Sequence, residues 1–250
     1  MIFDTHCHLG HDAVAPAAVR ARAAAAGVSL VLDVGIDLAS SRAASARSRS
    51  LPGTHWSAGL HPNDAQRFAA EWPQLAELCA EPGCVAVGET GLDFYRDWCP
   101  PAEQEQALVA HLELARRLGK PVILHCRDAF APLFAVLRRE GAPAGVMHCF
   151  SGDVAAARQA LDLGLYLSFA GPLTYPKSEA LRAAAAFAPA DRILVETDAP
   201  FLPPQGWRGQ RNEPAYVTAT VAKLAEVRSL TPDAAAAITC ANGCRLFRVG

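Results

Sequence analysis

Short apolar runs of strand length recur along the chain and alternate with longer stretches, rich in alanine and arginine, that have helical periodicity. The strand-like runs cover residues 2–5, 30–34, 56–60, 85–88, 122–124, 145–147, 165–169 and 193–196. The helix candidates between them cover 14–26, 39–49, 68–80, 102–118, 129–140, 153–163 and 177–188. Two or three more helices are expected after Glu213. The pattern therefore predicts eight successive strand and helix units.

Strands that alternate with helices through short connections are typical of a parallel sheet. Eight such units within 250 residues favour an α/β fold of the (β/α)8 type, a TIM barrel, over an open doubly wound sheet, which stays the alternative. No Gly/Ser-rich or Pro-rich linker divides the chain, and residues 202–210 are interpreted as a loop after the eighth strand. We expect residues 1–250 to form a single barrel domain with extra C-terminal helices.

Composition and charge narrow the class of protein. The chain is 51% hydrophobic and 19% charged, with a net charge of −2, which is typical of a globular protein and argues against a broad basic face for nucleic acid. No apolar run approaches the roughly 18 residues of a membrane span. The N-terminal residues resemble no signal peptide, so a cytoplasmic location and reduced cysteines are expected. No obligate protein partner is evident.

The clearest candidate chemistry follows the first strand-like run, in the sequence His6-Cys7-His8. Because side chains alternate along a strand, both imidazoles point to one side and Cys7 to the other. Two imidazoles on one side of a strand can chelate a metal ion, although two hydrogen-bonded histidines are the plainer interpretation.

Four further groups with metal-ligand chemistry stand at the ends of other strand-like runs. They are Glu89, His125, His148 and Asp198. A parallel barrel gathers the C-terminal ends of its strands around one mouth, where barrel enzymes carry their catalytic residues. The sequence therefore predicts that these four groups face His6 and His8.

Six ligands exceed the three that a catalytic zinc ion normally takes from protein, so a two-metal centre fits better. We expect Glu89 to bridge the two ions. One ion would be held by His6, His8 and Asp198, and the other by His125 and His148. The imidazole-rich set suits a transition metal such as Zn²⁺ or Mn²⁺ in at least one position, with Mg²⁺ as a candidate for a labile one.

Seven motifs together resemble the TatD family of metal-dependent deoxyribonucleases. They are His6-Cys7-His8, Gly59-Leu60-His61-Pro62, Gly88-Glu89-Thr90-Gly91-Leu92-Asp93, residues 121–127, His148-Cys149-Phe150-Ser151-Gly152, Glu196-Thr197-Asp198-Ala199-Pro200 and Arg211-Asn212-Glu213-Pro214. The resemblance runs in order from residue 2 to residues 242–247. It implies a TIM-barrel metallohydrolase that cleaves phosphodiester bonds in DNA, and it places the metal ligands on the same six residues.

Three side chains are candidates for catalysis beside the ions. Asp198 is the candidate general base for the attacking water, with Glu89 holding both ions. His61 ends the third strand and would contact a phosphate or transfer a proton, or else only line the wall. Glu196 points the same way as Asp198 and would orient a ligand or form an ion pair below the mouth. The cysteines beside the predicted ligands, Cys7, Cys126 and Cys149, are expected to pack against the helices.

Substrate contacts are expected from loops that follow the strand ends. The candidates are Tyr95, Arg96, Arg127, Arg208 and Arg211, which could stack on bases or bind phosphates. A deep barrel mouth admits a strand end more easily than a duplex, which favours a 3′–5′ exonuclease acting on single-stranded DNA. The alternatives are a two-metal hydrolase of another ester or amide, such as an aminoacyl-tRNA ester or a small phosphoester, and a binding protein without turnover.

Overall fold

Eight parallel strands pair in sequence order in the computed structural model, which describes residues 1–11 and 14–250. The strands are β1 (Ile2–Cys7), β2 (Val28–Val34), β3 (Thr54–Ala58), β4 (Cys84–Asp93), β5 (Val122–Arg127), β6 (Gly145–Met147), β7 (Tyr166–Phe169) and β8 (Ile193–Val195). The segment after β8 joins the end of β1, because Asp198 N–H donates to the carbonyl oxygen of His6 (2.9 Å) and His8 N–H to that of Ala199 (2.8 Å). The predicted (β/α)8 barrel is thus confirmed.

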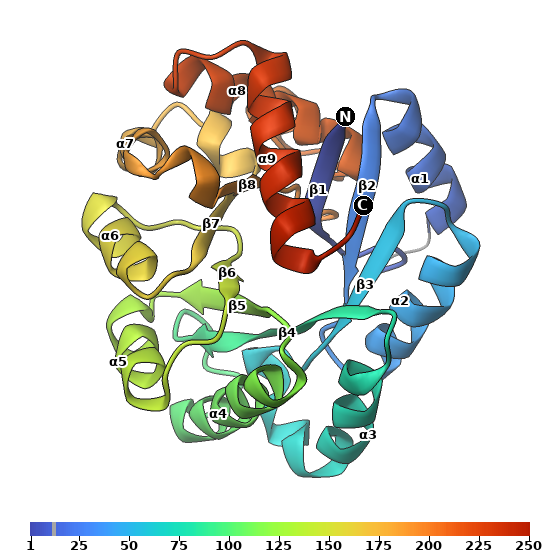
Figure 1. Cartoon of the computed structure of the whole chain (residues 1–250), viewed down its shortest axis with the longest axis vertical. Coiled ribbons are helices and arrows are strands. Elements are labelled where there is room, and N and C mark those ends of the chain that lie inside the picture. The colour runs from blue at the N-terminus through green and yellow to red at the C-terminus, as the bar shows by residue number, and fades with distance from the viewer. Residues whose placement is uncertain (12–13) are drawn as a thin grey trace.

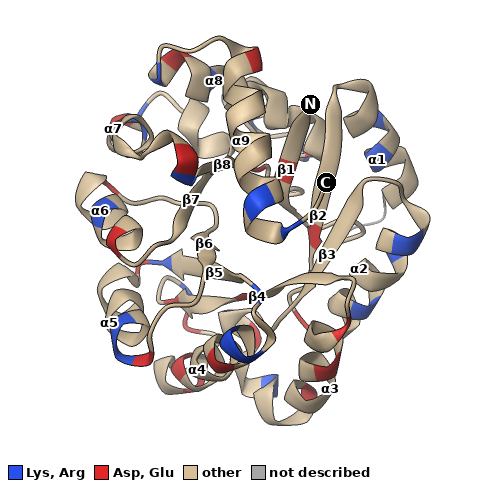
Figure 2. Ribbon diagram, in the orientation of Figure 1, with Lys and Arg blue, Asp and Glu red and all other residues tan. Residues whose placement is uncertain are grey.

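Nine α-helices pack around the strands or across one end of the barrel in the described part of the chain (Figure 1). They are α1 (Pro16–Ala25), α2 (Leu38–Ser50), α3 (Phe68–Ala80), α4 (Pro101–Leu118), α5 (Phe130–Glu140), α6 (Val154–Asp162), α7 (Glu179–Phe187), α8 (Val217–Val227) and α9 (Pro232–Phe247). The last two are the extra C-terminal helices expected from the sequence. Much of the charge lies on these helices, around the largely uncharged strands (Figure 2). None of the described helices is both long and apolar enough to cross a bilayer.

The strands divide the apolar side chains into two layers because successive residues face opposite sides. In β5, Val122 and Leu124 belong to the outer layer between strands and helices, whereas Ile123 belongs to the cluster inside the barrel. Burial on both sides explains why the strands read as short continuous apolar runs.

Helix α9 covers the N-terminal end of the barrel. Its Phe247 packs edge-on against Phe3 of β1, with ring centroids 6.0 Å apart, and joins the cluster inside the barrel. Asn242 of α9 donates to the carbonyl oxygens of Ala190 and Ile193, where β8 begins. With this end closed, the opposite end is left to carry a site.

Strand β4 differs from the sequence prediction, which ended it at residue 88. It continues to Asp93 because its pairing with β5 shifts register between Val87 and Thr90 and then resumes. Gly91 permits the close approach: it has φ +148°, and a Cβ atom there would lie 2.0 Å from the carbonyl oxygen of His125. The extension carries Glu89 into the mouth from within the strand.

Candidate metal centre

His6 and His8 converge at the mouth as the sequence predicts. Their Nε2 atoms are 3.2 Å apart, and both residues are buried. Cys7 between them points into the outer layer, where its thiol donates to the carbonyl oxygen of Leu32 (3.4 Å). The alternation along β1 therefore produces the predicted pair of imidazoles.

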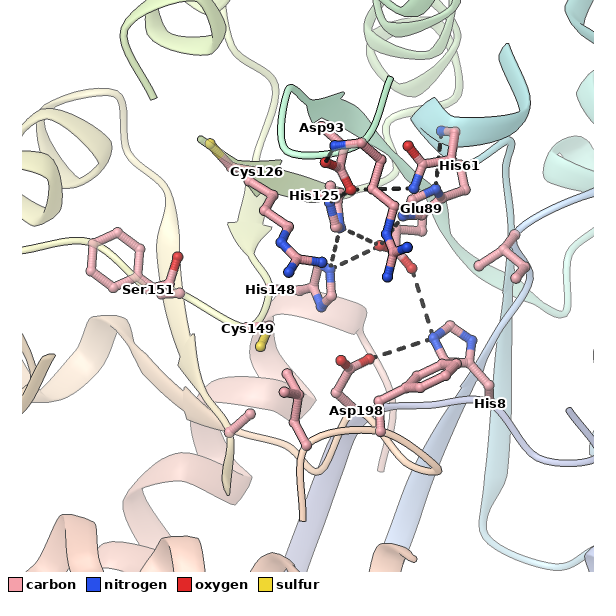
Figure 3. A pocket seen from close by; sticks show the side chains of 18 of the residues that line it. His8, His61, Glu89, Asp93, His125, Cys126, His148, Cys149, Ser151 and Asp198 are labelled. Atoms are coloured by element: carbon pink, nitrogen blue, oxygen red, sulfur yellow. Dashed lines mark hydrogen bonds and ion pairs between the residues drawn. The ribbon is translucent and has the colours of Figure 1, made fainter. Parts of the chain in front are cut away.

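Glu89 lies at the centre of the cluster (Figure 3). Its Oε1 atom is 2.9 Å from His125 Nδ1 and 2.9 Å from His148 Nε2. Its Oε2 atom is 3.3 Å from His6 Nε2 and 3.8 Å from His8 Nε2. The two oxygens of one carboxylate thus face two separate pairs of imidazoles.

Asp198 completes the side of the mouth formed by His6 and His8. Its Oδ1 atom is 3.5 Å from His8 Nε2 and 3.8 Å from His6 Nε2. Asn212 secures the loop on both sides of Asp198, because its side-chain amide donates to the carbonyl oxygens of Thr197 (2.9 Å) and Phe201 (2.6 Å). Asn212 belongs to the motif of residues 211–214, and its structural role could not be inferred from the sequence.

Three imidazoles have an acceptor behind them, on the ring nitrogen that faces away from Glu89 or Asp198. His8 Nδ1 faces the carbonyl oxygen of Val34 (2.9 Å), His148 Nδ1 the carboxylate of Glu196 (3.3 Å), and His125 Nε2 the carboxylate of Asp93 (3.3 Å). An acceptor behind the ring fixes the proton on the outer nitrogen and leaves the inner one free to bind a metal. The expected contact of Glu196 with a candidate ligand is therefore present.

His61 has the opposite arrangement. Its Nδ1 accepts a hydrogen bond from the backbone N–H of Asn63 (3.1 Å), while its Nε2 lies 3.5 Å from Glu89 Oε1. Burial, together with the neighbouring His125, lowers the pKa of His61 to about 3. The neutral ring must therefore carry its proton on Nε2, pointing into the site.

The carboxylates of the centre are held in their ionised form. Burial would raise the pKa of Glu89, but the His148 and His125 rings facing it keep that pKa well below the ordinary value. Burial also opposes the charge on Asp198, yet the His8 and His148 rings facing it lower the pKa of this carboxyl. Against the effect of burial, Glu89 and Glu196 raise the pKa of His148. The cluster thus favours positive charge at its centre.

The donor set fits a divalent cation. Three groups of side chains bring their ligand atoms within 4.8 Å of one another: His6, Glu89 and His148; His6, His8 and Asp198; and His61, Glu89 and His125. Imidazole nitrogens with carboxylate oxygens are ligands that zinc and manganese accept. The grouping links His148 to His6 more closely than the sequence suggested, and it includes His61.

Asp93 was missed as a functional residue. Beyond its contact with His125, it accepts a hydrogen bond from Asn63 Nδ2 (3.2 Å) and from the backbone N–H groups of Tyr95 (3.0 Å) and Arg96 (3.1 Å). Burial opposes its ionisation, but the His125 ring facing it lowers the pKa of Asp93 to about 2. Alternation along a longer fourth strand would have placed it on the same side as Glu89.

The structure divides the predicted substrate residues into two sets. Tyr95, Arg96 and Arg127 lie together, since Arg127 Cζ is 3.7 Å from the centre of the Tyr95 ring and both arginines line a cavity of about 870 Å³ over the cluster. Arg208 instead lies over the ring of Tyr175, at 4.4 Å. Neither Arg208 nor Arg211 is among the described residues that line the cavity.

The cysteines differ from the expectation at one position. Cys126 packs against the outer layer as expected and also borders the cavity. Cys149 faces the cavity, because β6 ends at Met147 and Cys149 has φ +42°, so strand alternation no longer applies. The prediction that Cys149 points to the helices is wrong.

Comparison with known proteins gives consistent results. The sequence profile described as TatD related DNase matches residues 3–248. The chain is 40% identical to an uncharacterized metal-dependent hydrolase TatD of Mycobacterium tuberculosis, covering 99% of this chain and 98% of that protein. It is 42% identical to the 3′-5′ ssDNA/RNA exonuclease TatD of Cronobacter sakazakii, covering 91% and 89%. The crystal structure of YJJV, a TatD homolog from Escherichia coli K12, superposes with a TM-score of 0.90 at 31% identity, covering 100% and 98%.

Proposed function

The chain belongs to the family of TatD related DNases, and from this membership we propose that it is a 3′–5′ exonuclease that hydrolyses phosphodiester bonds in single-stranded DNA. One observation carries the proposal: six imidazole and carboxylate side chains, which lie in or just after five different strands, meet at one mouth with Glu89 between them. We assign residues 1–250 to one catalytic domain, since the family profile spans 3–248 and all eight strands share one sheet.

We assign two divalent ions to the centre, with Glu89 bridging them. One would be held by His6, His8 and Asp198, and the other by His125 and His148. Divalent ions in this position would lower the pKa of a water and neutralise charge on the phosphoryl oxygens. The abundance of imidazole favours Zn²⁺ or Mn²⁺ over Mg²⁺ in at least one position.

The ionised Asp198 is our candidate general base. Its carboxylate lies at the mouth, and its lowered pKa leaves it free to accept a proton at neutral pH. His61 is assigned to the substrate, since the proton on its Nε2 makes that atom a hydrogen-bond donor, which suits a phosphoryl oxygen better than a cation. In this assignment His61 is not a metal ligand, and the six predicted ligands hold the ions.

The rim of the cavity supplies contacts to the rest of the strand. Arg96 and Arg127 are suited to phosphates, and the exposed Tyr95 ring to a base. Asp93 links this loop to the centre, because one of its oxygens faces His125 and the other accepts the N–H groups of Tyr95 and Arg96. Contacts of Arg208 and Arg211 with a longer strand stay predictions.

The test compares the wild type with Asp198→Asn on single-stranded DNA labelled at either end. Metal-stripped protein is incubated with Mg²⁺, Mn²⁺ or Zn²⁺, and bound metal is measured beside the rate. We expect metal-dependent shortening from the 3′ end, and a variant that keeps most of its metal but loses turnover. Shortening from the 5′ end would refute the polarity. No cleavage by fully metallated wild type would refute the nuclease in favour of another ester or amide substrate.

A further inference from the structure

Exposed large apolar side chains concentrate at the mouth of the barrel. Among the described residues, Phe94, Tyr95 and Trp98 follow β4, and Phe201 and Leu202 follow β8. Strands 4 and 8 lie on opposite sides of an eight-stranded barrel, so these loops form two facing walls. Large apolar groups on a surface commonly mark a binding site.

The two walls differ in charge. Arg96 and Arg127 are the Lys and Arg side chains among the described residues that line the cavity, and both come from the β4 and β5 side. Arg96 Cζ lies 4.5 Å from the centre of the Trp98 ring. This wall, formed by Tyr95, Arg96, Trp98 and Arg127, thus pairs cations with aromatic rings and is called here the cationic wall.

The wall after β8 presents Phe201 beside the metal centre. Its ring is 43% exposed, packs edge-on against His11 with centroids 5.0 Å apart, and lies 6.1 Å from the ring of His8. The backbone of Phe201 is fixed at both ends: its N–H donates to the carbonyl oxygen of Asp198 (2.9 Å), and its carbonyl oxygen accepts from Asn212 Nδ2 (2.6 Å). An exposed aromatic side chain on a backbone fixed in this way is a preorganised platform for an aromatic ligand.

We propose that Phe201 stacks on the base of the 3′-terminal nucleotide, and that the rest of the strand leaves the site over the cationic wall. This inference rests on the proposed function. The terminal nucleoside carries a single phosphate, the one at the bond to be cleaved, so it needs an apolar surface and no cation. Each further nucleotide brings another phosphate, which matches Arg96 and Arg127. The asymmetry of charge across the mouth therefore determines on which side of the mouth the rest of the bound strand lies.

The experiment measures kcat/KM for release of the terminal nucleotide from two single-stranded DNAs that differ in one group. One ends in 3′ thymidine and the other in a 3′ tetrahydrofuran residue, which lacks the base. The enzymes are the metal-loaded wild type, Phe201→Ala, Phe201→Trp and, as control, Phe187→Ala, which removes a similarly exposed ring (38%) from α7.

In the wild type we expect the thymidine terminus to be preferred, and in Phe201→Ala we expect this preference to fall about 10-fold, which corresponds to about 1.4 kcal/mol of stacking. Phe201→Trp should restore the preference, and Phe187→Ala should leave it unchanged. An equal loss on both termini, or no loss, overturns the inference.

A binding measurement separates this inference from the proposed function. Calorimetry compares deoxythymidine 5′-monophosphate with 2-deoxyribose 5-phosphate on the metal-loaded proteins. Weaker binding of the nucleotide alone by Phe201→Ala supports the platform, and equal binding of both ligands by the wild type overturns it. If the wild type cleaves neither DNA, the proposed function fails, and the calorimetry alone decides on the platform.

Discussion

Burial of His111 against the barrel makes the stability of the protein depend on pH in the acid range. It lies in α4 and is fully buried, where its Nδ1 donates to the carbonyl oxygen of Ala107 (2.7 Å) and its Nε2 accepts from the backbone N–H of Leu60 (3.1 Å). Burial lowers the pKa of His111 from 6.5 to about 4. The ring therefore stays neutral in the folded protein over a range in which it becomes charged in the unfolded chain.

The magnitude follows from these two values. Below pH 6.5 protonation favours the unfolded chain, and the folded protein takes up the proton only near pH 4. The difference corresponds to about 2 kcal/mol of stability lost by about pH 5, and about 3 kcal/mol once the pH falls to about 4. Above pH 6.5 the ring is neutral in both states and this loss disappears.

The assay is urea unfolding of the wild type and His111→Gln at about pH 8 and about pH 5, with a chelator present so that metal release does not contribute. A glutamine can still accept the N–H of Leu60 but does not titrate. The variant should be less stable than the wild type at both pH values. We expect this difference in the free energy of unfolding to be about 2 kcal/mol smaller at the lower pH. A loss of the same size at both pH values would refute the argument from burial.

Two further predictions concern the two ends of the barrel. Glu89→Ala should reduce bound metal from the two equivalents that we propose to less than one, because both pairs of imidazoles lose their shared carboxylate. Metal analysis tests this, with the exposed Glu113→Ala as control, and retention of both equivalents would show that Glu89 does not bridge the ions. Phe247→Ala should destabilise the protein by about 3–5 kcal/mol, because the ring fills the closed end, while the metal content stays unchanged. Urea unfolding measures the loss of stability, and a loss below about 1 kcal/mol would contradict the conclusion that α9 closes this end of the barrel.

Much of the fold was predictable because the sequence repeats one physical pattern. Parallel strands buried on both sides are short apolar runs, and the helices between them carry the charge, so the order of elements could be inferred from hydrophobicity alone. The C-terminal end of β4 could not be inferred in this way. Its last residues contain Gly91 and Asp93, which local patterns assign to a loop, and only the pairing with β5 keeps them in the strand.

The site was predictable where a ligand stands in a strand of regular alternation, as His125 does in β5. The prediction failed where the backbone leaves strand geometry, as at Cys149. Asp93 was missed because β4 was expected to end at residue 88, and Asn212 was missed because its contacts with Thr197 and Phe201 form across an irregular loop and leave no trace in local spacing.

The cluster around Glu89 also has a consequence for the order in which the protein acquires activity during its synthesis. His6 and His8 leave the ribosome first, and Asp198 follows only after all eight strands have been made. The same few residues that bring Asp198 to His8 also join the end of β8 to β1. A nascent chain therefore has no complete centre, and hydrolysis begins only in molecules whose first and last strands have met.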